Sequence, residues 1–191
     1  VRTHYKYGKH CRLTEELEPM ATRKSSKARQ EPWNKGIIAG QRNPFSRSDV
    51  GRIKKKLAKR GDAGLRDLAL FSTSIDTMLR IPDLLGLTVK DVRKRNRVMR
   101  DTVDLITAGK GQRIQCTLSK ATMSVLDRWI DQSSKKPNDR LFTGQTSSRS
   151  KAITSRQVNR LVKVWASDVG LDASQYGTES LRRTRSKYIL N

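Results

Sequence analysis

The chain has 191 residues, which is room for one domain and a tail, and 35% of them are hydrophobic. Lysine and arginine number 41 against 18 acidic residues, so the formal net charge is +23. Such an excess repels itself unless a polyanion neutralises it, which favours nucleic acid as the partner over a membrane surface. No apolar run is long enough for a bilayer span or a secretion signal, so we expect a cytoplasmic, nucleoid-associated protein.

Cysteine and histidine are scarce. Cys11 and Cys116 are the two cysteines, and His4 and His10 are the two histidines. Their spacing fits neither a disulfide framework nor a zinc site. The sequence also has no carboxylate cluster typical of a two-metal nuclease, so we expect no metal and no cofactor.

Residues 1–44 are polar, basic and rich in helix-breaking residues. We expect them to form an N-terminal arm that is disordered in the absence of DNA. Two hypotheses remain for the start of the native chain. In one it begins at Met20 and residues 1–19 are not native; in the other it begins earlier.

Residues 45–191 are patterned as a folded domain, in which helical spacing predicts four helices before the last segment. The first begins at Ser46 or Ser48 and ends at Gly61 and Gly64. The fourth opens with the capping box Thr154–Gln157. Apolar residues define the four buried faces: Val50, Ile53 and Leu57; Leu68, Phe71, Ile75 and Leu79; Val125, Leu126, Trp129 and Ile130; Val158, Leu161, Val162, Trp165 and Val169.

Between the second and third helices the hydrophobic period changes to two, which predicts a β-hairpin around a glycine-containing turn at 107–112. A last helix is expected to begin at Thr178 or Ser180. The predicted fold class is therefore mostly α with a small antiparallel β-sheet, that is, α+β. The alternating residues are Val103 and Leu105 before the turn, then Ile114, Cys116 and Leu118 after it.

Three segments, in this order, are similar to the motifs of the tyrosine recombinase (phage integrase) catalytic domain. Arg66–Leu87 resembles the first box, in which Arg80 is followed three positions later by an acidic residue and then by Leu-x-x-Leu. Gly109-Lys110-Gly111 resembles the hairpin that carries the family's lysine. Thr178–Thr184 resembles the box His-x-x-Arg, with its arginine at position 182.

The resemblance implies the fold of that domain and a metal-independent chemistry that breaks and rejoins DNA. Arg80 and Arg182 would clamp the scissile phosphate, because each guanidinium can donate two hydrogen bonds to its oxygens. Asp83 would orient Arg80, and Lys110 would protonate the leaving oxygen. The alternatives are a surface ion pair for Arg80 and Asp83 and an ordinary solvated turn residue for Lys110.

The sequence departs from the family at the remaining catalytic positions. Glu179 stands where the family has His, and a carboxylate there repels a phosphate. The family's second His or Trp and its nucleophilic Tyr would come after Asn191. Tyr188 follows Arg182 too closely to be that nucleophile and is interpreted as a core or helix-surface residue, and Tyr176 is no better placed.

Three functions stay open: a catalytically defective remnant that still binds duplex DNA, a fragment of an active recombinase, and a DNA- or RNA-binding regulator that reuses the fold. The family also implies DNA integration, site-specific recombination and self-association on DNA. Six basic side chains are candidate contacts to the DNA backbone, each against the alternative of a solvated surface residue: Lys54, Lys55, Lys56, Arg183, Arg185 and Lys187.

Overall fold

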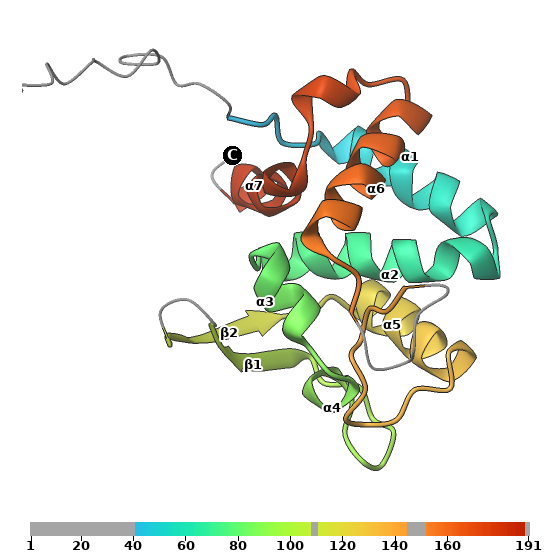
Figure 1. The fold of residues 1–191 in the computed structure, drawn as a ribbon, viewed down its shortest axis with the longest axis vertical. Helices are drawn as coiled ribbons and strands as arrows, with labels where there is room; N and C mark the ends of the chain where they lie inside the picture. The colour runs from blue at the N-terminus through green and yellow to red at the C-terminus, as the bar shows by residue number, and fades with distance from the viewer. Residues whose placement is uncertain (1–40, 108–110, 145–151, 190–191) are drawn as a thin grey trace, which may run out of the picture. The chain divides into compact units, whose positions relative to one another are not determined.

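The computed structural model of the chain describes residues 41–107, 111–144 and 152–189, within a unit that spans residues 40–191 (Figure 1). The arm up to residue 40, Met20 and Lys110 lie outside these residues. The elements, in chain order, are α1 (Arg47–Lys59), α2 (Asp62–Thr77), α3 (Ile81–Gly86), α4 (Val89–Val92), β1 (Thr102–Ile106), β2 (Arg113–Thr117), α5 (Lys120–Gln132), α6 (Ser155–Asp168), the 3-10 helix η1 (Ala173–Gln175) and α7 (Thr178–Ile189).

Helix α2 is the centre of the core. It packs against α1, α5, α7 and β2, so twelve of its sixteen residues are buried rather than those of one face alone. Leu70 and Phe71 have no exposed surface. Burial of a side chain of this size contributes about 1.5–3 kcal/mol to stability, which makes α2 the support on which the other elements are positioned.

The junction of α1 and α2 differs from the sequence prediction. Ser46 is the N-cap of α1 and forms a capping box with Asp49, as the serine at this position suggested. The expectation that Gly64 ends α1 was wrong, because α1 ends at Lys59 and Gly64 lies in the first turn of α2. A Cβ atom at Gly64 would lie 2.2 Å from the Leu57 carbonyl oxygen, so this glycine allows the two helices to approach each other.

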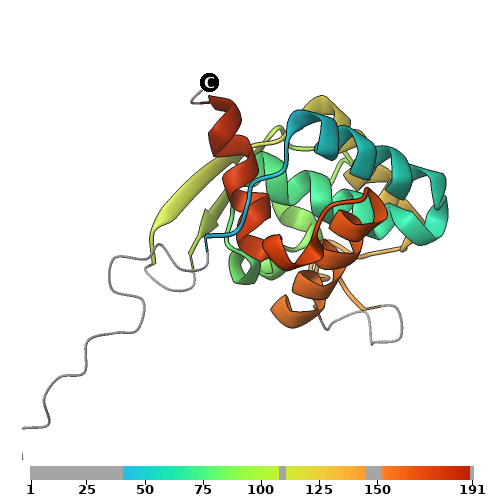
Figure 2. The same ribbon diagram turned by 90° about the horizontal axis from the view of Figure 1, so that it is seen from above.

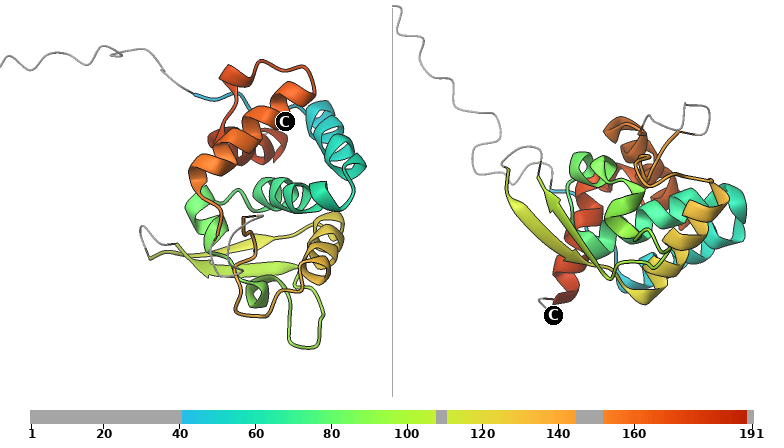
Figure 3. Two further views of the ribbon diagram at one scale, coloured as in Figure 1. Left: turned by 45° about the vertical axis from the view of Figure 1, so that its right-hand side comes forward. Right: turned by 90° about the horizontal axis from the view of Figure 1, so that it is seen from below.

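Strands β1 and β2 form the predicted antiparallel hairpin, with Val103 opposite Cys116 and Ile106 opposite Arg113 (Figure 3). Val103 and Cys116 are buried, which attaches this face of the hairpin to the core. Cys116 Sγ lies 3.4 Å from the backbone oxygen of Thr77, at the end of α2. Burial raises the pKa of the Cys116 thiol, so it stays protonated at neutral pH.

Two short helices, α3 and α4, follow α2 where the sequence analysis assigned no separate elements. Each has too few residues for a helical period to be visible. Leu84 of α3 and Val92 of α4 have no exposed surface, so both helices are fixed by packing. A capping box of Thr88 and Asp91 also holds α4.

Phe45 connects the beginning of the domain to its end. Its ring stacks on Tyr176 at 4.6 Å and meets Phe71 edge to face. Its backbone N–H donates to Thr184 Oγ1 of α7 at 3.1 Å. Residues 41–44, which were assigned to the arm, also contact the domain, since the Asn43 N–H donates to the Gln175 carbonyl. None of the helices in the described residues combines the length and the apolar character required for a bilayer span.

Candidate functional site

Arg80 lies at the junction of α2 and α3 and is exposed to solvent. Helix α2 ends at Thr77, and its C-cap Met78, with a φ of 52°, turns the chain through the left-handed region. Leu79 and Ile81 on either side of Arg80 are only 5% and 6% exposed. Because both neighbours are anchored in the core, the backbone at Arg80 is held in place while its guanidinium faces solvent.

Arg182 lies in the first half of α7 and is also exposed. The opposite side of this helix is buried through Leu181 and Thr184, which are 1% and 0% exposed. One turn further on, Arg185 Nη1 donates to the backbone oxygen of Asp76 at 2.6 Å. This bond joins α7 to the end of α2, two residues before Met78.

Arg80, Asp83 and Arg182 line one cavity of about 310 Å³. The hairpin contributes Thr107 and Gln112 to the same cavity, and α7 stands beside the hairpin (Figure 2). The structure thus brings together three of the four residues that the motifs suggested, from segments far apart in the chain. Lys110 lies outside the described residues, but Thr107 and Gln112, which flank positions 108–110, are hydrogen-bonded to each other at 2.9 Å.

The charges around this cavity favour an anion. Its lining has two guanidinium groups and one carboxylate, that of Asp83. Glu179 adds a second carboxylate nearby, with Oε1 3.6 Å from Arg182 Nη1. Both side chains of that pair are about half exposed, so it is a weak surface ion pair that a phosphate can displace. Two guanidinium groups can together bind the oxygens of one phosphodiester.

Comparison with known proteins identifies the family. The model of the phage integrase family matches residues 45–191. The chain belongs to the phage integrase family. The tyrosine recombinase XerC of Corynebacterium efficiens is 29% identical over 129 residues, which are 66% of this chain and 38% of XerC.

Solved structures of recombinases share the fold of this integrase-family chain. XerA recombinase has a TM-score of 0.61 at 20% identity, over 77% of this chain and 50% of XerA. XerH, in a pre-cleavage complex with its difH substrate, has a TM-score of 0.60 at 19% identity, over 77% and 42%. The Tn1549 transposon integrase, in complex with circular intermediate DNA, has 0.55 at 20%, over 78% and 52%. The chain therefore spans about half or less of the length of these relatives.

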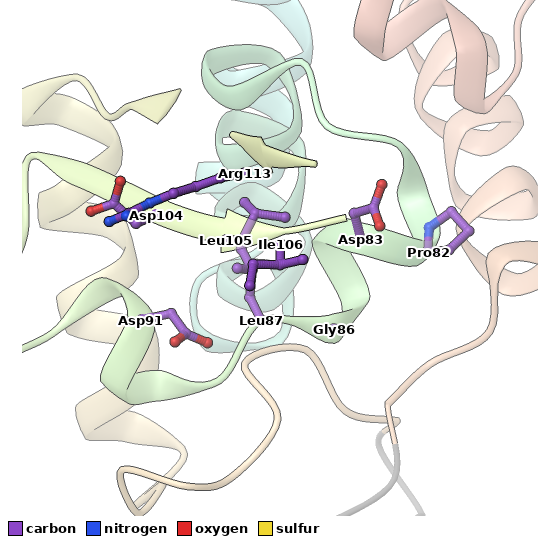
Figure 4. Close-up of a pocket in the computed structure, with 9 residues that line it drawn as sticks. All are labelled: Pro82, Asp83, Gly86, Leu87, Asp91, Asp104, Leu105, Ile106 and Arg113. Carbon is purple, nitrogen blue, oxygen red and sulfur yellow. The ribbon is translucent and has the colours of Figure 1, made fainter. Parts of the chain in front are cut away.

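Asp83 of the integrase-family domain borders two cavities. The second, of about 540 Å³, lies between α3, α4 and β1 (Figure 4). The aliphatic side chains of Leu87, Leu105 and Ile106 gather in its middle.

Two tyrosines of this integrase-family domain lie in the described residues, and both are structural. Tyr188 Oη donates to the Phe45 carbonyl at 3.0 Å, and Tyr176 is buried against the ring of Phe45. Burial raises the pKa of both phenols; for Tyr188 the Arg47 guanidinium opposes this rise and Asp49 adds to it. Neither lines the cavity of Arg80 and Arg182. These contacts agree with the interpretation of Tyr188 as a core or helix-surface residue.

The six candidate backbone contacts fall into two groups, and none of them lines the cavity. Lys55, Lys56 and Lys187 are exposed, and Lys54 is partly buried on α1. Arg183 and Arg185 instead form bonds within the fold. Arg183 Nη1 donates to the Arg42 carbonyl at 2.9 Å, and Arg185 donates to that of Asp76.

Sequence reasoning missed the neutral part of the cavity. Thr107, Gln112 and Met78 line it, and the signal for the first two was their position beside Lys110 in the predicted turn. In the described ranges, no three His, Cys, Asp or Glu side chains are grouped so that they could hold a metal ion.

Proposed function

We propose that this domain binds duplex DNA and holds one phosphodiester group between Arg80 and Arg182. The observation that carries the proposal is the shared cavity of these two arginines. The net charge of +23 supports a polyanionic partner. The descriptions of the XerH and Tn1549 integrase structures, both in complex with DNA, support duplex DNA as that partner.

In this proposal the two guanidinium groups stabilise the charge on the non-bridging oxygens of the phosphate. Asp83 orients Arg80, and Lys110 is proposed as the donor of a proton to the leaving oxygen. The nucleophile would come from outside the described residues, since Tyr176 and Tyr188 are bound into the core. The described part of the chain is therefore proposed to bind DNA, and cleavage to need a tyrosine outside it.

The first test measures duplex affinity by fluorescence anisotropy between 50 and 300 mM salt. The variant R80A/R182A is compared with R156A/R160A, which removes the same charge from exposed positions on α6. Loss of this one phosphate contact lowers the salt dependence, the slope of log K against log salt, by about 0.9, and the control leaves it unchanged. An equal loss in both variants, or no binding by the folded wild-type chain, would refute the proposal.

A second test separates binding from cleavage. The chain is incubated with a nicked duplex, and a covalent protein–DNA adduct is sought by denaturing electrophoresis. We expect none, because the Tyr188 hydroxyl is hydrogen-bonded to the Phe45 carbonyl and the Tyr176 ring is buried against Phe45. An adduct that disappears in Y188F would assign cleavage to this chain and contradict the binding-only role.

Two further parts of the proposal follow from the family. We propose that the protein acts inside the cell, where DNA is present, and that it self-associates on DNA. Sedimentation velocity of the DNA complex tests self-association. The alternative of an RNA-binding regulator predicts equal affinity for a structured RNA and for a duplex of the same length, and a marked duplex preference excludes it.

A further inference from the structure

A third cavity, of about 620 Å³, is lined mainly by basic side chains. Three segments form it: α4, the turn at 93–100 that follows α4, and the loop at 136–139. It shares no residue with the cavity of Arg80 and Arg182. Figure 1 places α4 at the lower end of the unit, whereas α7 lies in its upper half. Its cationic residues are Lys90, Arg93, Lys94, Arg95, Arg100 and Lys136.

The turn at 93–100 is held in a defined conformation. Lys94 N–H donates to the Val98 carbonyl at 2.8 Å, and Arg97 N–H donates to the Lys94 carbonyl at 3.0 Å. At its base, Arg93 forms ion pairs of 3.0 and 2.7 Å with Asp127 and Asp131 of α5. These bonds fix the backbone that carries the cations, so an anion needs to order only their side chains.

The loop at 136–139 closes the other side of the cavity. Its Pro137 carbonyl accepts the Lys90 N–H at 2.8 Å, and its Asp139 carbonyl accepts the Val89 N–H at 3.1 Å. The Asp139 carboxylate is the acidic group in the lining, and it accepts the backbone N–H of Lys136 at 2.8 Å. Backbone bonds thus hold Lys90 and Lys136 at the same opening.

The net positive charge of this cavity favours an anionic ligand. Six cationic residues face one carboxylate, and of the six only Arg93 is neutralised by the carboxylates of α5. Lys90, Lys94 and Lys136 are exposed. Like charges held this close repel one another, and a ligand with several negative charges relieves that repulsion.

The lining also indicates which anion fits. It contains no aromatic side chain on which a base could stack. Lysine and arginine without a stacking surface bind the phosphates of a nucleic acid and do not read its bases. The volume lies within the roughly 300–1,000 Å³ of ligand sites, so the cavity has room for more than one small anion.

We propose that this cavity is a second site for the phosphodiester backbone of duplex DNA, separate from the one at Arg80 and Arg182. The proposal rests on the proposed function in that its ligand is duplex DNA. Through the two sites, one domain contacts DNA at two places on its surface. The second contact adds affinity that does not depend on the sequence of the DNA.

The test compares two triple variants of the full chain for duplex affinity across a salt series. K90Q/K94Q/K136Q removes three lysines of the cavity. K59Q/K120Q/K163Q removes three exposed lysines that do not line it. At about 150 mM salt the first variant should bind at least about tenfold more weakly, with the salt slope reduced by two to three. The second should stay within about twofold, since screening limits the reach of a surface charge to about 8 Å.

Circular dichroism checks that both variants fold. Three outcomes then test the proposed site. A loss confined to K90Q/K94Q/K136Q supports the site. Equal affinity of the two variants overturns it while the proposed function stands, because the wild-type chain still binds. A titration with inorganic tripolyphosphate supplies the third outcome. If the three lysines govern its binding and leave duplex binding unchanged, the cavity is a site for free polyphosphate and the DNA proposal is overturned.

Discussion

The Arg185 guanidinium donates to the backbone carbonyl of Asp76, with Nη1 2.6 Å from that oxygen. The Asp76 carboxylate accepts the backbone N–H of Ser119, the N-cap of α5, at 2.9 Å. Asp76 is thus bonded to α7 on one side and to α5 on the other. Arg185, which the charge pattern of α7 placed among the candidate DNA contacts, is therefore hydrogen-bonded within the fold.

Replacing Arg185 by Ala should therefore lower the free energy of unfolding by about 1.5 kcal/mol, the value of a hydrogen bond from a charged donor. Urea denaturation measures this change. K187A, at an exposed position on the same helix, should stay within about 0.5 kcal/mol of the wild-type chain. If R185A kept full stability and bound duplex more weakly, Arg185 would be a DNA contact instead.

Glu179 should weaken DNA binding, because its carboxylate lies 3.6 Å from Arg182 Nη1 and competes with a phosphate there. E179Q is expected to raise duplex affinity about two- to threefold, which corresponds to a surface ion pair of about 0.5 kcal/mol. Anisotropy at 50 mM salt gives the largest difference. D168N is a matched control, since it removes a carboxylate that pairs with Arg60 away from the cavity. An equal gain in D168N would show that only net charge matters.

Two helical glycines should respond in opposite directions to replacement by alanine. G51A should stabilise the protein by up to about 1 kcal/mol, because nothing lies within 4 Å of the added Cβ and alanine favours the helix. G64A should destabilise it by about 2 kcal/mol, because its Cβ would lie 2.2 Å from the Leu57 carbonyl oxygen. Thermal unfolding of both variants gives the comparison. Stabilisation by G64A would mean that α1 and α2 separate easily.

Acid should destabilise the protein in part through Asp49. Burial would raise the pKa of this carboxyl, but hydrogen bonds from Ser46 and Arg52 outweigh burial and lower its pKa below the ordinary 3.8. A lowered native pKa means that the unfolded chain takes up the proton first as pH falls. The stabilisation is therefore complete above about pH 4 and is lost as pH falls through the native pKa.

D49N is expected to cost about 1 kcal/mol at pH 7, because it weakens the hydrogen bonds that Asp49 accepts from Ser46 and Arg52, and less than that at pH 2.5. Denaturation at both pH values measures how the difference in unfolding free energy between D49N and the wild-type chain decreases at low pH. D101N, at an exposed position, should change stability by less than about 0.5 kcal/mol at both. If this difference did not change with pH, the carboxylate charge of Asp49 would not contribute to stability.

The sequence was sufficient to predict those helices and strands whose apolar residues recur at a regular spacing. The long helices and the hairpin have runs of apolar residues at spacings of three to four or of two, and the resemblance of Arg66–Leu87 to the family's first box pointed to Arg80 and Asp83. Helices α3 and α4 were not predicted, because a helix of one or two turns is too short to show a hydrophobic period. For α4 a signal did exist, since Thr88 and Asp91 have the spacing of a capping box.

Other features could not be predicted from the sequence because they depend on contacts between segments that are far apart in the chain. The role of Arg185 depends on a carbonyl more than a hundred positions away, and a charge pattern on one helix contains no information about it. The cavity lined by Lys90 and Lys136 is assembled from three segments, each of which looks like an ordinary basic loop or turn. Motif spacing predicts residues within one segment, whereas tertiary packing decides which segments meet.

The end of α2 gives the two candidate clamping arginines a common support. Arg80 follows it directly through the left-handed turn at Met78, and Arg182 lies one helical turn from the residue bonded to Asp76. Cys116 of β2 also lies 3.4 Å from the Thr77 carbonyl oxygen at this end, so the hairpin side of the cavity is attached there as well. Segments that are far apart in the chain thus share one anchor, the last turn of α2.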